Sequence, residues 1–324
     1  MAIAPFSDEQ LRALINLRQR YEVWRDAERR LRDLPYDLRI KTVQDRRYLY
    51  EIFDRSGNGK SLGALDGDRQ AQHEQYHAEK TALKERLDSA RAVLTESGQI
   101  ARAVRVPPLA SDAGPILREA DVRGLLDGSL MVAGTNCMAA YSLEAGGLID
   151  VPDETLDFDM AWSSTEESDG TPVWSMLKAV DPTFTLNTER TFQARNAKAY
   201  EFELLVAPSR ALTLGRKEQP RPIPLPEQEW LLLGKPVDQV TICRDATSVR
   251  MVAPDPRWFA LHKLWLSAQD KRDPRKRHKD HRQGLAVLDA VAEAMPHYPL
   301  DAAFVDSIPP ELVPHWQEWR DGRG

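Results

Sequence analysis

A chain of 324 residues with 42% hydrophobic and 29% charged residues is long enough for two or three packed units and too apolar for general disorder. Its formal net charge of −6 argues against non-specific wrapping of nucleic acid by the whole surface. The start of the chain has no basic or apolar leader, and no window approaches the ~18 apolar residues of a membrane helix, so we expect a cytoplasmic protein with no membrane partner. Cys137 and Cys243 are the only cysteines, and we expect both to be buried thiols.

Residues 1–104 are predicted to form a helical N-terminal unit. Ser7 and Gln10 fit a capping box, and apolar residues from Leu11 to Trp24 recur near helical spacing, which predicts helix from residue 7 to about 53 with a turn near Pro35. A loop is expected over 56–63, followed by a second helix over 66 to about 100.

Residues 105–255 are predicted to form a mixed α/β core, and residues 256–324 a helical C-terminal unit. After a proline-containing linker over 106–115 we expect a short helix to residue 126, a strand over 130–132, a helix over 136–144 and a strand over 156–162. Further strands are predicted over 184–187, 199–206, 230–233, 239–243 and 248–252.

Acidic side chains occur at alternating positions in two of these strands. Asp157 and Asp159, in the Thr-Leu-Asp-Phe-Asp run that begins at Thr155, would project from one face of their strand. Glu201 and Glu203 likewise share a face, and one of them can complete a carboxylate triad. Carboxylates are ligands of Mg²⁺. The sequence therefore predicts a magnesium site that handles a nucleoside triphosphate.

The strand over 130–132 runs into Gly134 and Thr135, a turn of small residues that lets phosphates approach the backbone. In this order, the turn, a helix with the pair Ala140-Tyr141 and the Thr-x-Asp-x-Asp strand resemble the polymerase-β-like nucleotidyltransferase superfamily, and more closely its bacterial branch with a Gly-Thr turn. The turn is Gly-Ser or Gly-Gly in commoner members, and their third carboxylate is Asp.

This resemblance implies an α/β (α+β) fold, a mixed-sheet nucleotidyltransferase core flanked by N-terminal and C-terminal helical units. It also implies that Gly134 and Thr135 hold the triphosphate of a nucleoside triphosphate (NTP). Asp157 and Asp159 would bind two Mg²⁺ (or Mn²⁺) ions, and Glu203 would be the third, catalytic carboxylate.

A basic stretch follows the predicted core. Between Asp255 and Arg282 lie nine Lys or Arg residues against four Asp, a local excess of positive charge that can steer phosphates. The resembling branch has a helix with a His-Lys pair and a helix with a Lys-Asp step behind its active site, which implies that Lys263 and Lys279 reach the triphosphate. A solvated basic face is the alternative.

The predicted function is an enzyme, a Mg²⁺-dependent nucleotidyltransferase that moves a nucleoside monophosphate from an NTP to a hydroxyl and releases pyrophosphate. The acceptor hydroxyl can belong to RNA such as a tRNA end, to a protein or to a small molecule. The alternative is a catalytically silent nucleotide-binding or scaffold protein of the same fold, and the superfamily includes toxins and defence enzymes.

Three other patterns favour different chemistry. The run from His73 to His77 fits the zinc-protease pattern His-Glu-x-x-His, although its helix is polar throughout. Gly59-Lys60-Ser61 resembles the end of a P-loop, but Asp54 stands where the first glycine is required. His278 and His281 lie among positive charges that would repel a metal.

Overall fold

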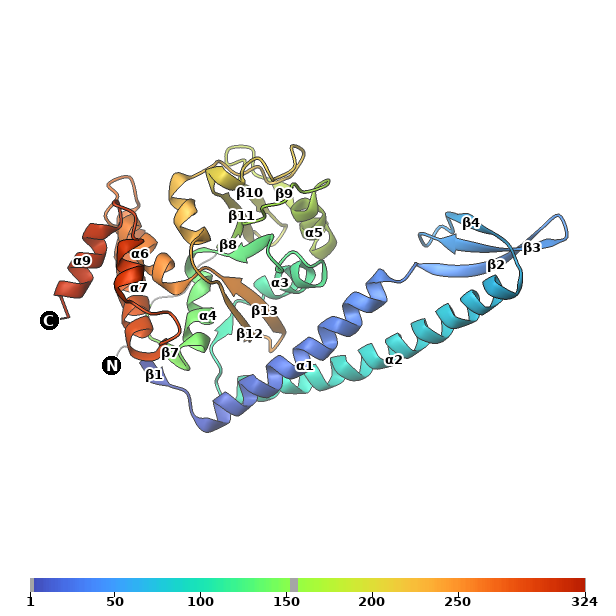
Figure 1. The fold of residues 1–324 in the computed structure, drawn as a ribbon, viewed down its shortest axis with the longest axis horizontal. Helices are drawn as coiled ribbons and strands as arrows, with labels where there is room; N and C mark the ends of the chain where they lie inside the picture. The colour runs from blue at the N-terminus through green and yellow to red at the C-terminus, as the bar shows by residue number, and fades with distance from the viewer. Residues whose placement is uncertain (1–2, 152–156, 324) are drawn as a thin grey trace. The chain divides into compact units, whose positions relative to one another are not determined.

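The computed structural model describes residues 3–151 and 157–323 (Figure 1). The chain splits into two compact units, one of Met1–Arg18 with Gly98–Gly324 and the other of Gln19–Ser97. The boundaries predicted at residues 104 and 255 stay predictions. Within the described ranges, no helix has both the length and the apolarity that crossing a membrane requires.

The unit of Gln19–Ser97 consists of parts of two long helices that run side by side and a sheet at one end of them (Figure 1). Its elements are α1 (Asp8–Asp33), β2 (Asp37–Val43), β3 (Arg46–Ile52), β4 (Gly59–Ala64) and α2 (Gly67–Ala103). The strands form an antiparallel sheet in the order β2-β3-β4. Buried Leu38, Leu49 and Tyr76 pack between this sheet and α2, which joins sheet and helix in one small core.

The predicted helix is confirmed by α1 as far as Asp33 and is wrong beyond the turn near Pro35, where β2 and β3 lie. The loop predicted over 56–63 is wrong from Gly59, where β4 begins. Val43 pairs with Arg46, so Gln44 and Asp45 form a two-residue loop, and both have positive φ, 47° and 61°. Two such residues in succession make the hairpin turn whose twist matches antiparallel strands. The capping box at the start of α1 is confirmed: the Ser7 N–H donates to Gln10 Oε1 (2.9 Å) and the Gln10 N–H donates to Ser7 Oγ (3.3 Å).

The other unit is built around a five-stranded mixed sheet in the order β6-β8-β11-β10-β9. These strands are β6 (Leu130–Val132), β8 (Asp157–Trp162), β11 (Glu201–Val206), β10 (Gln193–Arg195) and β9 (Thr185–Leu186). Strands β8 and β11 are parallel, and every other neighbouring pair is antiparallel. The predicted class, an α+β fold with helices at both ends, is confirmed.

The remaining elements surround this sheet. Two smaller sheets pair β1 (Ile3–Pro5) with β7 (Gly147–Ile149), and order β13 (Ser248–Ala253), β12 (Val237–Cys243) and β5 (Pro108–Leu109). The helices are α3 (Ala113–Val122), α4 (Cys137–Glu144), α5 (Pro172–Val180), α6 (Pro256–Ser267), α7 (Pro274–Ala294), α8 (Ala302–Asp306) and α9 (Val313–Asp321), with 3₁₀ turns η1 (Gly134–Asn136), η2 (Pro208–Arg210) and η3 (Pro226–Leu232). Cys137 and Cys243 are free and buried, as predicted.

The strand predicted over 230–233 is wrong, since Trp230 to Leu232 lie in η3. A short apolar run has no periodicity that separates a strand from one buried helical turn. Pro226 at the first position of η3 begins the turn with its fixed φ.

The register of β8 against β11 decides where the acidic side chains lie. Phe158 pairs with Phe202 on the core side, and both rings are fully buried. Asp159 pairs with Glu203, one residue further along each strand. Because successive side chains alternate between faces, this pairing places the acidic residues of both strands on the face opposite the phenylalanines.

Helices α6 and α7 begin with the same N-cap arrangement and pack closely against each other (Figure 1). Asp255 and Asp273 are N-caps whose carboxylates accept the N–H of the residue two positions on, and a proline follows each at the first helical position. A Cβ at Gly284 would lie 2.7 Å from Leu264 Cγ, so only glycine allows this approach of α7 to α6.

Helix α5 has no cap of its own, because the Thr171 side chain makes no capping hydrogen bond. Glu218, fully buried, supplies one from a distant loop: its carboxylate accepts the Val173 N–H (3.1 Å) and the Trp174 N–H (2.8 Å). A carboxylate at a helix N-terminus also opposes the positive end of the helix dipole.

We expect Glu218→Ala to lower the melting temperature by several degrees, because two buried N–H groups lose their acceptor at about 1–3 kcal/mol each. Glu218→Gln keeps one carbonyl acceptor and should lose less. Thermal unfolding followed by circular dichroism measures both, with substitution of the exposed Glu167 by Ala as the control. An unchanged melting temperature in Glu218→Ala would contradict the capping role.

Candidate active site

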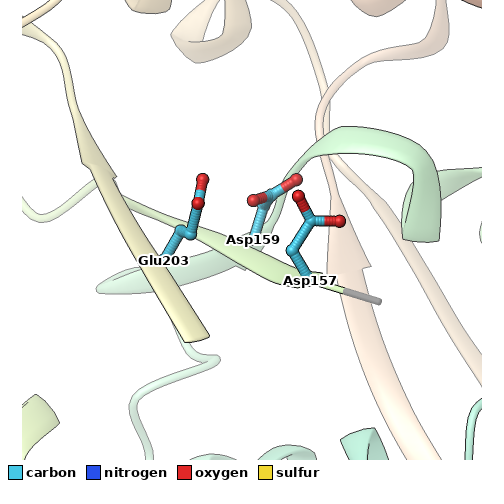
Figure 2. A group of neighbouring side chains, drawn as sticks. All are labelled: Asp157, Asp159 and Glu203. Atoms are coloured by element: carbon cyan, nitrogen blue, oxygen red, sulfur yellow. The ribbon is translucent and has the colours of Figure 1, made fainter. Parts of the chain in front are cut away.

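Three carboxylates converge at the sheet. Asp157 and Asp159 of β8 and Glu203 of β11 each offer an oxygen, and these atoms lie within 4.8 Å of one another (Figure 2). Over residues 3–151 and 157–323, no other three His, Cys, Asp or Glu side chains gather in this way. Thr155, which begins the predicted Thr-x-Asp-x-Asp strand, lies outside the described residues. Oxygen ligands from carboxylates are those that Mg²⁺ and Mn²⁺ prefer.

The turn after β6 is shaped by its contact with Asp159. Gly134 has φ +63°, and a Cβ there would lie 2.0 Å from Asp159 Oδ2. The neighbouring Ala133 N–H donates to the Asp159 carbonyl (2.9 Å), and the Asn136 side-chain amide donates to the Asp157 carbonyl (3.3 Å). Glycine is thus required twice at position 134, for the left-handed backbone and for the close carboxylate.

The carboxylates repel one another. Burial, followed by the charges of Asp157 and Glu203, raises the pKa of Asp159 to about 8. Burial and the charge of Asp157 also raise the pKa of Glu203. A bound cation would relieve this repulsion, so the site has the electrostatic character of a cation site.

Glu203 and not Glu201 completes the group, as the resemblance implies. Glu201 forms an ion pair with Arg195. The Gln193 amide lies between the two glutamates, and its Nε2 donates to Glu201 Oε2 (2.8 Å) and Glu203 Oε1 (3.0 Å). Gln193 therefore holds the Glu203 carboxylate in place from the adjacent strand β10.

A pocket of about 270 Å³ opens over the carboxylates. Every site residue predicted from the sequence lines it: Gly134, Thr135, Asp157, Asp159, Glu203, Lys263 and Lys279. Sequence separation between the first and last of these is large, and the sheet and helices α6 and α7 bring them together.

The basic residues around the pocket fall into two kinds. Lys263 is buried and donates to Asp280 Oδ1 (2.7 Å), whose other oxygen accepts from Arg272 Nε (2.9 Å). Lys279 also lines the pocket, and burial and the charge of Lys263 lower its pKa. Because Lys263 is held in an ion pair with Asp280 and Lys279 is only half-buried, the Lys279 ammonium is the easier of the two to engage with an anionic ligand.

Lys276 belongs to the site, and the sequence reasoning missed it. Its Nζ lies 3.7 Å from Asp157 Oδ2, and the side chain lines the pocket. Lys276 and Lys279 are three residues apart on α7, so they share a helix face. This three-residue spacing is the sequence feature from which Lys276 could have been predicted as a site residue.

The other patterns do not join this site. His77 Nε2 lies 3.1 Å from His73 Nε2 and 3.0 Å from the Leu38 carbonyl, and neither histidine is part of a group of three metal-binding side chains in the described ranges. Lys60 lies in β4 and pairs with Glu51 (3.1 Å). His278 and His281 do not line the pocket.

We expect Mg²⁺ to raise the melting temperature of the wild type, and Gly134→Ala to abolish this increase because its methyl group displaces the Asp159 carboxylate. Gly146→Ala is the matched control: its φ is +66° and a Cβ there meets nothing within 4 Å, so it carries only the backbone strain of about 1 kcal/mol. Differential scanning fluorimetry with and without Mg²⁺ measures both. A wild-type Mg²⁺ response in Gly134→Ala would refute this reading of the turn.

A second expectation follows from the raised pKa of Asp159, about 8 against an ordinary 3.8. Because folding raises this pKa, the free energy of unfolding of the cation-free protein falls as the pH rises from 3.8 towards 8. Below pH 3.8 this carboxyl is protonated in both the folded and the unfolded chain and does not change the stability. Asp159→Asn should therefore raise the cation-free melting temperature at pH 8, by a margin that shrinks as the pH falls.

Asp181→Asn is the control of opposite sign, because hydrogen bonds from Thr183 lower the pKa of Asp181. Asp181 thus stabilises the fold above pH 3.8, and its replacement should lower the melting temperature or leave it unchanged. Thermal melts over a pH series with EDTA measure both variants. A lower melting temperature for Asp159→Asn at pH 8 would contradict the repulsion.

Comparison with known proteins bears on the region that holds this site. A family model described as nucleotidyltransferase matches residues 111–308, which is more than half of the chain and includes every element that lines the pocket. Searches of curated proteins and of solved structures found no match. The residues matched confirm the resemblance seen in the order of turn, acidic strand and third carboxylate. The chain belongs to the nucleotidyltransferase family and is a nucleotidyltransferase.

Proposed function

We propose that the protein transfers a nucleoside monophosphate from an NTP to a hydroxyl acceptor, with Mg²⁺ and with release of pyrophosphate. The observation that carries this proposal is the convergence of Asp157, Asp159 and Glu203 in one pocket with lysines of α7. This pocket lies within the residues that the family model matches.

The carboxylates fit a divalent cation. Asp157, Asp159 and Glu203 would hold it, with Asp157 and Asp159 able to serve two ions. Burial and the negative charges of Asp157 and Glu203 raise the pKa of Asp159, and a cation would balance these charges. When bound, the metal supplies Lewis-acid activation of the phosphoryl group and of the acceptor hydroxyl.

The chain's own residues would bind and orient the triphosphate. Gly134 and Thr135 line the pocket, and their backbone N–H groups and the Thr135 hydroxyl would contact a phosphate. Lys276 and Lys279 would contact phosphate oxygens. Lys263, which donates to Asp280, adds positive electrostatic potential to the pocket.

The reaction exchanges one phosphorus–oxygen bond for another. The acceptor oxygen bonds to the α-phosphorus, the bond from that phosphorus to the oxygen bridging to the β-phosphorus breaks, and pyrophosphate leaves with the electron pair. Glu203 would accept the proton of the acceptor hydroxyl, a role that its raised pKa favours. Lysines neutralise the charge that develops on pyrophosphate.

The acceptor is proposed as a class, a hydroxyl of RNA such as a tRNA end, of a protein or of a small molecule. All three suit the same in-line chemistry, because the pocket groups identified above would act on the triphosphate and on the acceptor hydroxyl, and not on the rest of the acceptor. The label-transfer experiment below separates them by where the label arrives.

We expect the wild type to transfer label from one of the four α-³²P-labelled NTPs to RNA, protein or small molecules of a cell lysate, with Mg²⁺ and not with EDTA. Glu203→Gln should lose about 100-fold or more of this rate, as when a general base is removed. Glu201→Gln is the matched control, since Glu201 lies on the same strand face but pairs with Arg195. It should retain most of the activity.

Labelled pyrophosphate from β,γ-labelled NTP, formed in step with the transfer, completes the test. Nucleotide binding by the wild type without any product would favour the silent nucleotide-binding alternative. Full activity of Glu203→Gln or of Asp157→Asn would show that the reaction runs elsewhere.

A further inference from the structure

Two residues that line the pocket, Gln228 and His262, each have a buried polar atom with no hydrogen-bond partner within the described part of the chain, Oε1 and Nε2 respectively. Their side chains are only 6% and 5% exposed. Buried polar atoms in folded proteins are nearly always paired, so an unpaired one that lines a pocket indicates a group for a ligand.

The two side chains come from two elements that pack on each other. Gln228 and Leu231 are three residues apart in η3 and therefore lie on one face of this 3₁₀ turn. Phe259, His262 and Leu266 lie at positions i, i+3 and i+7 of α6 and share a helix face. The pocket wall they make is apolar except for the amide and the imidazole.

The charges of this wall oppose phosphate binding. Glu227, next to Gln228, also lines the pocket and would repel a triphosphate, whereas Lys276 and Lys279 belong to α7. Burial and the charge of Lys263 lower the pKa of His262 to about 3, so the imidazole is neutral at pH 7. A neutral imidazole offers one N–H and one lone pair, and not a fixed positive charge.

The wall thus suits an uncharged, partly apolar group that carries a hydrogen-bond donor beside an acceptor. The nucleobases have this character, because each presents an N–H donor beside a ring-nitrogen or C=O acceptor on one edge. Glu227 would repel a phosphate at this wall, and Lys263, next to His262, is already paired with Asp280. Leu231 and Leu266 would cover the flat apolar face of a base better than a hydroxyl-bearing sugar.

We propose that Gln228 and His262 bind the edge of the nucleobase of the NTP and so determine which nucleotide the enzyme uses. This inference rests on the proposed function, since it takes an NTP as the donor. The Gln228 carbonyl accepts from a base N–H, and His262 Nε2 bonds the adjacent position. A site that hydrogen-bonds a ligand group rejects analogues that lack it, because its own buried atoms are then left unpaired.

The test measures affinity and needs no turnover. Wild type, Gln228→Met and His262→Phe are titrated with the α,β-methylene analogues of the four NTPs and with ribose 5-triphosphate, which has no base, in Mg²⁺ by calorimetry. Both substitutions keep side-chain volume and remove the hydrogen-bonding atom. Ser248→Ala is the matched control, because Ser248 Oγ is also buried and unpaired in the described residues but lies in β13, outside the pocket lining.

We expect the wild type to bind its preferred NTP analogue at least about 10-fold more tightly than ribose 5-triphosphate. Each variant should lose roughly 10-fold for that analogue, with flattened preference among the four bases and unchanged affinity for ribose 5-triphosphate. That unchanged affinity also shows that the variant is folded. The melting temperature of ligand-free Gln228→Met should not fall, whereas a purely structural glutamine would lower it.

Both variants keeping the wild-type affinities and base preference would overturn the proposal while leaving the transferase chemistry intact, as label transfer by the same variants would show. Wild type that binds ribose 5-triphosphate as tightly as every NTP analogue would overturn it as well. Wild type that binds no triphosphate would overturn both this inference and the proposed function.

Discussion

The repulsion among Asp157, Asp159 and Glu203 is the constraint on which the rest of the structure depends. The fold holds the backbones of these three acidic residues close together against the mutual repulsion of their carboxylates. The parallel pairing of β8 with β11 fixes Asp159 opposite Glu203, and buried Phe158 and Phe202 anchor the same two strands from the other side. Because Gly134 has no side chain, the Asp159 carboxylate can occupy the space that a Cβ would take. The packing energy of the core thus stabilises an arrangement that electrostatics alone disfavours.

The basic residues near the site fall into two groups, those that stabilise the fold through ion pairs and those placed to bind a ligand. Asp280 is fully buried and pairs with Lys263 and Arg272, so it compensates charge where α6 and α7 cross, next to the tight contact at Gly284. Removing one member would leave a buried charge unpaired, which is costly. By contrast, Lys276 is exposed and Lys279 is only partly buried, and both line the pocket from α7. Their position suits a ligand that arrives and leaves.

The sequence contained the parts of the site that depend on local pattern. Alternation in a strand was sufficient to place Asp157 and Asp159 together, and residue type and order pointed to Gly134 and Glu203. Lys276, Gln228 and His262 were not recognised as a set, because the direction of a helix or 3₁₀ face depends on tertiary packing. The hairpin at Gln44 and Asp45 was missed because neither residue is the glycine that usually marks such a turn.

The parallel pairing of β8 with β11 also bears on when activity can arise during synthesis. Parallel neighbours cannot be joined by a tight turn, and here α5, β9 and β10 lie between them in the chain. The lysines of α7 follow later still. Contacts between such distant segments close slowly and late. A nascent chain that has not yet released α7 from the ribosome therefore carries the carboxylates without their lysines, and competence for chemistry appears only near the end of translation of this unit.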